Sequence, residues 1–319
     1  ILLEEIIERN IGSMFLNYNV IAYSPFRIMR NADLTIDEEE AVDLLEEIQK
    51  QLKKRQWGEA IRLEIDEKMD KSLLKILKRE LSISSGDIYE IGGPLDLTFL
   101  MKMYGLEGFE HLKAPKYVPQ RVPALMNEDD IFTNIRKGDI LLHHPYETFA
   151  PVVNFVKSAA KDPDVLAIKQ TLYRVSGKSP IVAALSRAAQ QGKQVTVLIE
   201  VRARFDEENN INWCLALEKA GCHVFYGVPK LKTHSKITLV IRREAFGLRR
   251  YVHLATGNYN DVTARLYTDF GLFTCDDAIG RDAGAFFNLV TGYDETAPME
   301  KLIAAPLHLR KTLKALIKR

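Results

Sequence analysis

The chain has 319 residues, of which 46% are hydrophobic and 27% charged, and a net charge of +1. This is the composition of an ordinary soluble globular protein, and the balanced charge excludes a polyanion-binding signal spread over the whole chain, so any basic patch must be local. Three cysteines without a CxxC pair argue against a disulfide framework or a zinc site. The longest apolar runs, such as Val195 to Ile199, are too short to span a bilayer.

The length exceeds that of one typical domain, so we expect two domains and the start of a third. The chain begins at Ile1 without Met or a signal-like segment and stops inside a helical pattern at Arg319, so we interpret it as a fragment. Missing targeting signals and the cysteine usage predict a cytoplasmic protein, and they stay compatible with peripheral association with a membrane. We also expect the full-length protein to form a homo-oligomer.

The first part of the chain mixes helical and extended patterns. Helical spacing covers residues 1–10, 37–56 and 71–81, and extended patterns cover 20–29 and 60–65. Pro115, Pro119 and Pro123 then fall within a basic segment without a helical period, which is typical of a linker or a crossing strand. We therefore predict an α+β domain over residues 1–116 and a boundary near Tyr117.

After this boundary, apolar strands alternate with helices. Strand patterns cover residues 139–143, 164–172, 194–201, 223–226 and 270–274, and helical patterns cover 148–160, 180–191, 207–220 and 276–291. Continuous apolar strands between helices predict a mixed α/β sheet covered on both faces. We expect this domain to fill residues 117–293, and residues 294–319 to be the truncated start of a further domain, with a strand-to-helix pattern over 302–317.

The most informative stretch runs from Gly227 to Asn260. An alternating run from Ile237 to Arg242 is followed by a loop and by a return from Tyr251 to Ala255, which predicts a β-hairpin. Period-two spacing then places His234 and Lys236 on one face at the start of the first strand. A nucleophile or base beside a fixed cation suits chemistry on a phosphate, although a strand that happens to begin with these residues gives the same pattern.

His234 is the candidate nucleophile. Lys232 and Lys236 flank it, and the small Thr233 and Ser235 leave its ring accessible. Nearby cations disfavour the protonated imidazole, which leaves a lone pair free to attack phosphorus. The same cations would neutralise the phosphoryl oxygens during an in-line displacement. A single histidine also fits a structural role, so the residues alone leave both interpretations open.

Two arginines follow the predicted ends of buried strands. Arg174 closes the sequence QTLYR and Arg204 closes VRAR. Ligands of such sheets bind beyond the carboxyl ends of strands, and a guanidinium group matches the geometry of phosphate oxygens, so we expect both to clamp a phosphate. Salt bridges to Asp206 or Glu207 are the structural alternative. The face taken by Arg202, in the same stretch, is not decided by the sequence.

The segment after the hairpin adds polar candidates. Gly257 permits a close backbone approach, and Asn258 can orient a histidine or a phosphate. Tyr267 can stack on a base, and Asp269 can accept a hydrogen bond from a ring N–H. Each also fits ordinary capping or turn chemistry. No phosphate-binding loop of the form GxxxxGKS/T or GxGxxG occurs, so a nucleotide would be held by side chains.

The remaining histidines considered fit other roles. His143 and His144 are adjacent, and on a strand they point to opposite faces, which argues against a shared metal site. A structural role or a contact at the rim of a substrate site is the expectation for this pair. His253 lies inside the return strand of the hairpin, where we expect packing.

Several ordered motifs resemble one enzyme family. The segments YRVSGKSPIV, RARFDEENN, KTHSKI, ATGNYN and TARLYTDF are similar to those of the long-chain polyphosphate kinases of the phospholipase-D-like superfamily, and FRIMRNADLTIDEEEA near residue 26 resembles the head domain of that family. His234, Lys236 and Asn258 also resemble half of the HxK…N signature of phospholipase D. The Asp that usually follows five residues after this Lys is replaced by Ile241, which argues against lipase or nuclease activity.

The resemblance implies a fold and an activity. The fold would be part of an α+β head domain followed by the first phospholipase-D-like domain, a mixed sheet flanked by helices. The family's N-terminal domain and second phospholipase-D-like half, which supplies a further active-site histidine, would be missing. The activity would be reversible transfer of the γ-phosphate of ATP to a growing inorganic polyphosphate chain, through a phosphohistidine on His234.

The same resemblance assigns roles to individual residues. The expected site consists of the nucleophile and its neighbouring cation, a nucleotide contact and three phosphate contacts: His234, Lys236, Tyr267, Arg174, Arg204 and Asn258. Arg174 and Arg204 are expected to contact magnesium-bound phosphates, so Mg²⁺ accompanies ATP or ADP, and no nucleic-acid partner is expected. Two alternatives stay open: a phospholipase-D-like phosphodiesterase that uses the same histidine on an ester, and a non-catalytic domain that binds polyanions.

Overall fold

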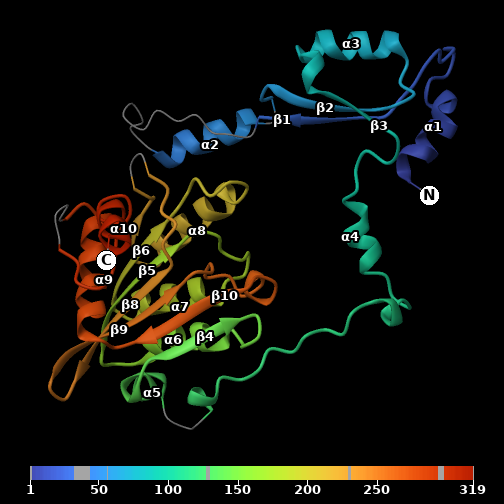
Figure 1. Cartoon of the computed structure of the whole chain (residues 1–319). Coiled ribbons are helices and arrows are strands. Elements are labelled where there is room, and N and C mark those ends of the chain that lie inside the picture. The colour runs from blue at the N-terminus through green and yellow to red at the C-terminus, as the bar shows by residue number, and fades with distance from the viewer. Residues whose placement is uncertain are drawn as a thin grey trace. The chain divides into compact units, whose positions relative to one another are not determined.

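The computed structural model describes residues 2–31, 44–55, 57–126, 130–228, 231–293 and 298–318. The chain divides into two compact units, one made of Ile1–Ile36 and Ile48–Pro115 and the other of Asp37–Glu47 and Lys116–Arg319 (Figure 1). The domain boundaries expected from the sequence, after residues 116 and 293, stay predictions. No helix in the described ranges is long and apolar enough to cross a membrane.

The part of the chain before the proline-containing segment forms a small sheet with helices. Its elements are α1 (Leu3–Met14), β1 (Phe26–Arg30), α2 (Leu44–Arg55), β2 (Ala60–Asp66), α3 (Lys71–Leu81), β3 (Ile88–Ile91) and α4 (Phe99–Tyr104). β2 pairs antiparallel with β1 and parallel with β3. The apolar face of α3, with Leu74 and Leu77, packs on Leu63 and Ile65 of the sheet. The α+β expectation is therefore confirmed, while the expected start of a helix at residue 37 lies outside the described residues.

The later part alternates strands and helices. Its elements are α5 (Ile131–Lys137), β4 (Ile140–His144), α6 (Ala150–Lys161), β5 (Val165–Leu172), α7 (Pro180–Gln190), β6 (Gln194–Ile199), α8 (Glu207–Lys219), β7 (His223–Phe225), β8 (Ile237–Glu244), β9 (Gly247–Ala255), β10 (Asp269–Thr274), α9 (Asp277–Val290) and α10 (Leu309–Ile317). Each strand and helix expected between residues 139 and 291 is present, with ends within two residues of the prediction, except that β9 begins at Gly247, four residues before the expected start at Tyr251. Over residues 302–317 the described structure contains α10 but no strand.

The larger sheet has the strand order β4-β10-β9-β8-β5-β6-β7 in the described residues. β5, β6 and β7 run parallel to one another. The hairpin β8–β9 joins them antiparallel, with β8 beside β5, and β10 and β4 continue the antiparallel part. The sheet is therefore mixed, as expected, and the predicted hairpin is confirmed.

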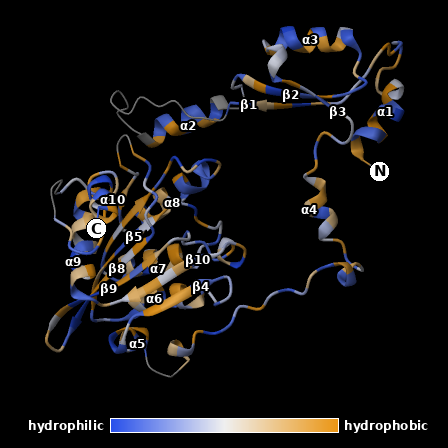
Figure 2. Cartoon of the chain, in the orientation of Figure 1, coloured by the Kyte–Doolittle hydropathy of each residue, from blue (hydrophilic) through white to orange (hydrophobic). Residues whose placement is uncertain are grey.

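Helices cover both faces of this sheet, and its strands are largely hydrophobic (Figure 2). Val252 of β9 packs with Phe287 of α9 on one face. Its neighbour Tyr251 points to the opposite face, where its ring lies 4.9 Å from that of Phe132 in α5. Phe155 of α6 lies on that same face, 5.2 Å from Phe273 of β10. Both faces of the sheet are therefore packed against helices.

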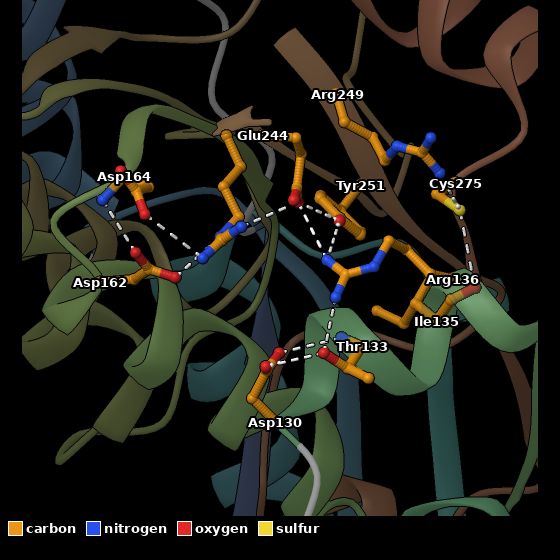
Figure 3. A network of polar contacts seen from close by, with 11 residues as sticks. Asp130, Thr133, Ile135, Arg136, Asp162, Asp164, Glu244, Arg249, Tyr251 and Cys275 are labelled. Atoms are coloured by element: carbon orange, nitrogen blue, oxygen red, sulfur yellow. Dashed lines mark hydrogen bonds and ion pairs between the residues drawn. The ribbon is translucent and has the colours of Figure 1, made fainter. Parts of the chain in front are cut away.

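A network of charged and polar groups holds the strands together at one of their ends, where β8 ends and β5 begins (Figure 3). Arg242, late in β8, pairs through Nε with Asp162 at 2.9 Å and through Nη1 with Glu244 at 2.9 Å. Arg136 of α5 donates from Nη1 to Glu244 at 3.1 Å and to the hydroxyl of Tyr251 at 3.0 Å. The network ties the far end of the hairpin to α5 and to the turn that leads into β5.

Candidate functional site

The candidate residues gather at the opposite ends of the strands because of the strand register. The parallel strands β5 and β6 end there, at Leu172 and Ile199. β8 runs antiparallel to β5 and pairs Thr238 with Gln170, so it begins where β5 ends. β9 returns antiparallel to β8 and ends at Ala255 beside the start of β8. The segments after β5, after β6, before β8 and after β9, which carry the candidate residues, thus meet at the same ends of the strands.

His234 lies in the loop that leads into β8, and its side chain is exposed. Its ring meets the ring of Tyr173 edge-on, with centroids 5.1 Å apart and planes at 82°. Surrounding protein atoms remove water from part of the ring, and together with the charge of Lys236 they lower the pKa of His234. The neutral imidazole, which carries a free lone pair, is therefore the main form at neutral pH.

Lys236 is buried, with 7% of its surface exposed. Its Nζ donates a hydrogen bond to the backbone oxygen of His234 at 2.5 Å and lies 5.3 Å from the centre of the Tyr173 ring. Burial lowers the pKa of Lys236 to about 8, against the opposing effect of the Asp269 charge. β8 begins only at Ile237, so His234 and Lys236 precede the strand and the expected shared strand face does not apply to them.

Arg174 and Arg204 lie beside each other in the loops after β5 and β6. Arg174 donates from Nη2 to the backbone oxygen of Arg204 at 3.3 Å, and its Nε pairs with Asp206 at 3.2 Å. Both arginine side chains are exposed. The salt bridge weighed as the structural alternative thus exists for Arg174, but the side chain remains 45% exposed. It can orient this guanidinium group and still leave it open to a ligand.

The loop after β9 carries Asn258 and reaches back toward the loop after β5. Ser176 donates to Asp261 at 2.8 Å, which joins the two loops. Asn258 is half-buried, and its Oδ1 has no hydrogen-bond partner in the described structure, as is also true of the Thr233 and Ser235 hydroxyls beside His234. Buried polar atoms without partners are rare in proteins, and the hydroxyl groups of Thr233 and Ser235 can donate to a ligand that binds beside His234.

Two further candidates of this loop have local explanations. The space beside Gly257 is filled by Asp269, whose Oδ2 lies 2.5 Å from the position that a Cβ would take. Asp269, considered as an acceptor for a ring N–H, accepts a hydrogen bond from the hydroxyl of Thr256 at 2.9 Å. Tyr267 precedes β10 with 64% of its surface exposed. Its ring is therefore available for stacking, but no described contact joins it to His234.

Three histidines have structural surroundings. His253 is fully buried, and its Nδ1 lies 3.0 Å from the hydroxyl of Tyr259, while burial lowers its pKa to about 3. His144 is buried beside the Glu147 backbone, and His143 stacks on Phe270 at 4.8 Å. These positions confirm the packing expected for His253.

Three residues near the candidate site are not predicted from the sequence. Thr171 accepts the N–H of Ile237 at 3.1 Å and donates to the backbone oxygen of Ser235 at 2.8 Å. Glu200 accepts the N–H of Thr233 at 2.6 Å, and Tyr173 contacts the ring of His234. The loop that carries His234 is thus held by Thr171 of β5 and by Glu200, which follows β6. A charged residue directly after the apolar run of β6 was the one signal available for Glu200.

The donor set fits phosphate better than a bare metal ion. Guanidinium groups offer no lone pair to a metal, so Arg174 and Arg204 can only contact the oxygens of a phosphate. In the ranges described above, no group of three or more His, Cys, Asp and Glu side chains is arranged to hold a metal ion.

Comparison with known protein families decides the assignment. The family model described as polyphosphate kinase C-terminal domain 1 matches residues 130–296, and the model described as polyphosphate kinase middle domain matches residues 1–103. The chain belongs to the polyphosphate kinase family. The family resemblance noted in the sequence motifs is thereby confirmed.

Individual relatives agree with this assignment. A polyphosphate kinase of Halalkalibacterium halodurans is 56% identical over 99% of the chain, and one of Bacillus anthracis is 53% identical over 99%. The crystal structure of a polyphosphate kinase from Porphyromonas gingivalis superimposes on 99% of the chain with a TM-score of 0.79 at 28% identity. The chain covers 45% of the first relative, 46% of the second and 45% of the crystallised chain. It thus spans about half the length of these family members.

Proposed function

We propose that the chain carries the phosphoryl-accepting site of an enzyme that reversibly transfers the γ-phosphate of ATP to inorganic polyphosphate, with His234 as the transient carrier. The proposal is supported most directly by the exposed His234 ring, whose pKa is lowered. A neutral, accessible imidazole beside fixed cations has the properties required of a nucleophile toward phosphorus.

In the first step, the lone pair of one ring nitrogen of His234 attacks the γ-phosphorus of magnesium-bound ATP. An N–P bond forms, the bond from this phosphorus to the bridging oxygen breaks, and ADP leaves with the bond's electron pair. Arg174 and Arg204 would bind the phosphate oxygens and Lys236 would add a third positive charge. Such fixed charges favour the transition state because they need no reorganisation when the charge shifts.

In the second step, a terminal oxygen of polyphosphate attacks the phosphorus held by His234. A new P–O bond forms, the N–P bond breaks, and the imidazole regains its lone pair. A P–N bond is reactive, so its transfer to another phosphate is not strongly uphill and can run in both directions. Tyr267, with its exposed ring, would stack on the nucleotide base, and Asn258 would donate its amide N–H groups to phosphate oxygens.

Labelling of the full-length protein with γ-labelled ATP separates this proposal from its two alternatives. A phosphotransferase acquires an acid-labile, base-stable label and passes it to polyphosphate. A phospholipase-D-like phosphodiesterase cleaves an ester without nucleotide and leaves no label from ATP. A non-catalytic polyanion-binding domain retains polyphosphate in a salt-sensitive manner, equally well after His234→Ala. Ester cleavage without nucleotide, or salt-sensitive polyphosphate binding by a wild-type protein that acquires no label from ATP, would reject the proposal.

The reaction of the whole enzyme requires more than this chain, in our proposal. The relatives are about twice as long as the matched region, and we expect the chain alone to transfer phosphate weakly or not at all. The homo-oligomer, the cytoplasmic location and the peripheral membrane association stay predictions for the full-length protein.

A further inference from the structure

Glu200 is a fully buried carboxylate that holds the loop before His234. It follows β6 directly, and none of its side-chain surface is exposed. Oε2 accepts the backbone N–H of Thr233 at 2.6 Å, and Oε1 accepts the backbone N–H of Arg202 at 3.0 Å. Thr233 is the immediate neighbour of His234. A buried carboxylate thus binds the main chain one residue before the candidate nucleophile.

Arg202 binds backbone oxygens of the same loop. Its Nε lies 3.4 Å from Oε1 of Glu200, and its Nη2 donates to the backbone oxygens of Val228, at 3.3 Å, and of Leu231. The Arg202 side chain is 17% exposed, so it faces into the protein and away from the role of a phosphate clamp. Carboxylate and guanidinium together bind one N–H and two carbonyl groups of the loop.

The chain is shaped to admit this pair. Gly227 adopts a positive φ of 83°, and a Cβ there would lie 3.4 Å from Oε2 of Glu200. Asn210 of α8, which is fully buried, donates its amide to the backbone oxygens of Tyr173, at 2.7 Å, and of Glu200, at 3.0 Å. The residue that contacts the His234 ring and the residue that holds its loop are thereby fixed to the same side chain.

We propose that Glu200 and Arg202 form a positioning pair, which sets the place of the His234 ring without touching the substrate. This inference rests on the proposed function of His234 and extends it to residues that bind the loop. A loop held at one main-chain atom only would let the ring move, and a misplacement of about 1 Å lowers rates by about 100-fold. Charge-assisted bonds to buried main-chain groups are strong enough to resist this movement.

The test compares Glu200→Gln with a matched variant, Asp282→Asn, in the full-length protein. Asp282 is also a buried carboxylate, and it accepts the backbone N–H groups of Glu300, Lys301 and Leu302. Both substitutions keep the side-chain shape and remove one buried charge that holds a loop, but only Glu200 holds the His234 loop. The rate of phosphohistidine formation is measured against ATP concentration, with hydrogen exchange of the backbone amides.

For Glu200→Gln we expect a rate of phosphohistidine formation lowered by about 10-fold or more, with the ATP concentration at half-maximal rate unchanged. Exchange should quicken at residues 231–237. For Asp282→Asn we expect the wild-type rate and faster exchange only at residues 300–302. A wild-type rate in Glu200→Gln, or equal rate losses in both variants, would overturn the inference, because the latter is what a general loss of stability produces.

Arg202→Lys and Arg202→Met cover the case in which Glu200→Gln does not fold. Lysine keeps the charge beside Glu200 but cannot reach both carbonyl groups as a planar fork, so we expect a lower rate with unchanged ATP dependence, and a larger loss with methionine. Wild-type rates in both would again reject the pair. Absence of any phosphohistidine in the wild type would instead reject the proposed function and, with it, the catalytic role of the pair, while the exchange data would still report whether the loop is held.

Discussion

The ammonium group of Lys236 lies 2.5 Å from the backbone oxygen of His234. The cation is therefore held against the main chain of the residue that it is proposed to assist, rather than swinging freely in solvent. Its burial, which lowers its pKa to about 8, makes its charge sensitive to pH in a range where most lysines stay protonated.

We predict that the rate of His234 phosphorylation falls as the pH rises through about 8, since Lys236 then loses the charge that neutralises the phosphoryl oxygens. Lys236→Arg keeps its charge at higher pH, so its alkaline fall should move upward even if its maximal rate is lower. Rapid-quench measurement of phosphoenzyme between about pH 6 and pH 10 checks this. Superimposable alkaline profiles would exclude Lys236 as their cause.

On the acidic side, we predict that phosphorylation persists below the ordinary imidazole pKa of 6.5, because burial and the charge of Lys236 lower the pKa of His234. Lys236→Met removes the second of these causes. Its acidic fall should therefore lie at higher pH than that of the wild type, which the same measurement detects. A fall at unchanged pH would assign the lowered pKa to burial alone.

We predict that Arg174→Ala and Arg204→Ala each lower the rate of phosphoenzyme formation by about 100-fold or more, because each removes a charge-assisted contact to the transferring phosphoryl group. Arg281→Ala is the control, since Arg281 lies on α9 and forms an exposed pair with Glu300. Single-turnover assays with ATP measure all three. Wild-type rates in both Arg174→Ala and Arg204→Ala would make them structural residues.

Two glycine substitutions should have opposite effects. In Gly257→Ala the new Cβ would stand 2.5 Å from Oδ2 of Asp269, so Asp269 or the loop with Asn258 must move, and both stability and phosphorylation rate should fall. Gly284 lies within α9, and beyond its chain neighbours and the backbone of its own helix no heavy atom lies within 4 Å of an added Cβ, so Gly284→Ala should stabilise the helix by about 1 kcal/mol. Thermal unfolding decides both; a Gly257→Ala variant as stable and active as the wild type would contradict the described packing.

The network of Arg242, Glu244 and Tyr251 at the other ends of the strands should make the stability of the protein depend on pH. Burial alone would raise the pKa of Glu244, but hydrogen bonds from Tyr251 and Arg242 outweigh it and the pKa is lowered. A carboxyl with a lowered pKa in the folded state stabilises above its unfolded pKa, and the contribution is lost as the pH falls through the folded pKa. Glu244→Gln should thus reduce the free energy of unfolding by about 1–3 kcal/mol at pH 7.

As the pH falls below the unfolded pKa of about 4.3 and through the lowered folded pKa, the difference between Glu244→Gln and the wild type should shrink, because the carboxyl group then becomes protonated in the folded state as well. Denaturant titrations across this range measure it. Glu80→Gln serves as the comparison, because Glu80 is 61% exposed in its pair with Arg79 and should change stability little at any pH. A constant difference down to low pH would show that Glu244 acts through packing rather than charge.

The sequence predicts most of the later fold because its signals are local. Alternation around a Gly-containing loop marks β8 and β9, and continuous apolar runs mark β5 and β6. The sequence patterns do not predict β3, α4 or α5, since Ile88–Ile91, Phe99–Tyr104 and Ile131–Lys137 are too short to show a period. The strand expected near residue 302 is absent from the described structure because the N–H groups there bind Asp282 instead of a neighbouring strand.

The candidate site divides in the same way. Residue type and position next to strands mark four candidates in the sequence: His234, Lys236, Arg174 and Arg204. In the structure they lie at the same ends of the strands. The hydrogen bond from Thr233 to Glu200 joins residues 33 positions apart, and no pattern in the chain announces such a pairing. The inward turn of Arg202 likewise depends on carbonyl groups of a distant loop. Residues that hold a loop through its backbone are thus hidden from sequence reasoning.

The central claim is tested most directly by locating the phosphoryl group. Full-length protein exposed to ATP, quenched in base and fragmented under conditions that preserve phosphohistidine, should carry the phosphoryl group on the peptide containing KTHSKI, at His234, and His234→Ala should carry none. Phosphorylation that persists in His234→Ala, or a wild-type phosphoryl group on another residue of the chain, would contradict the account.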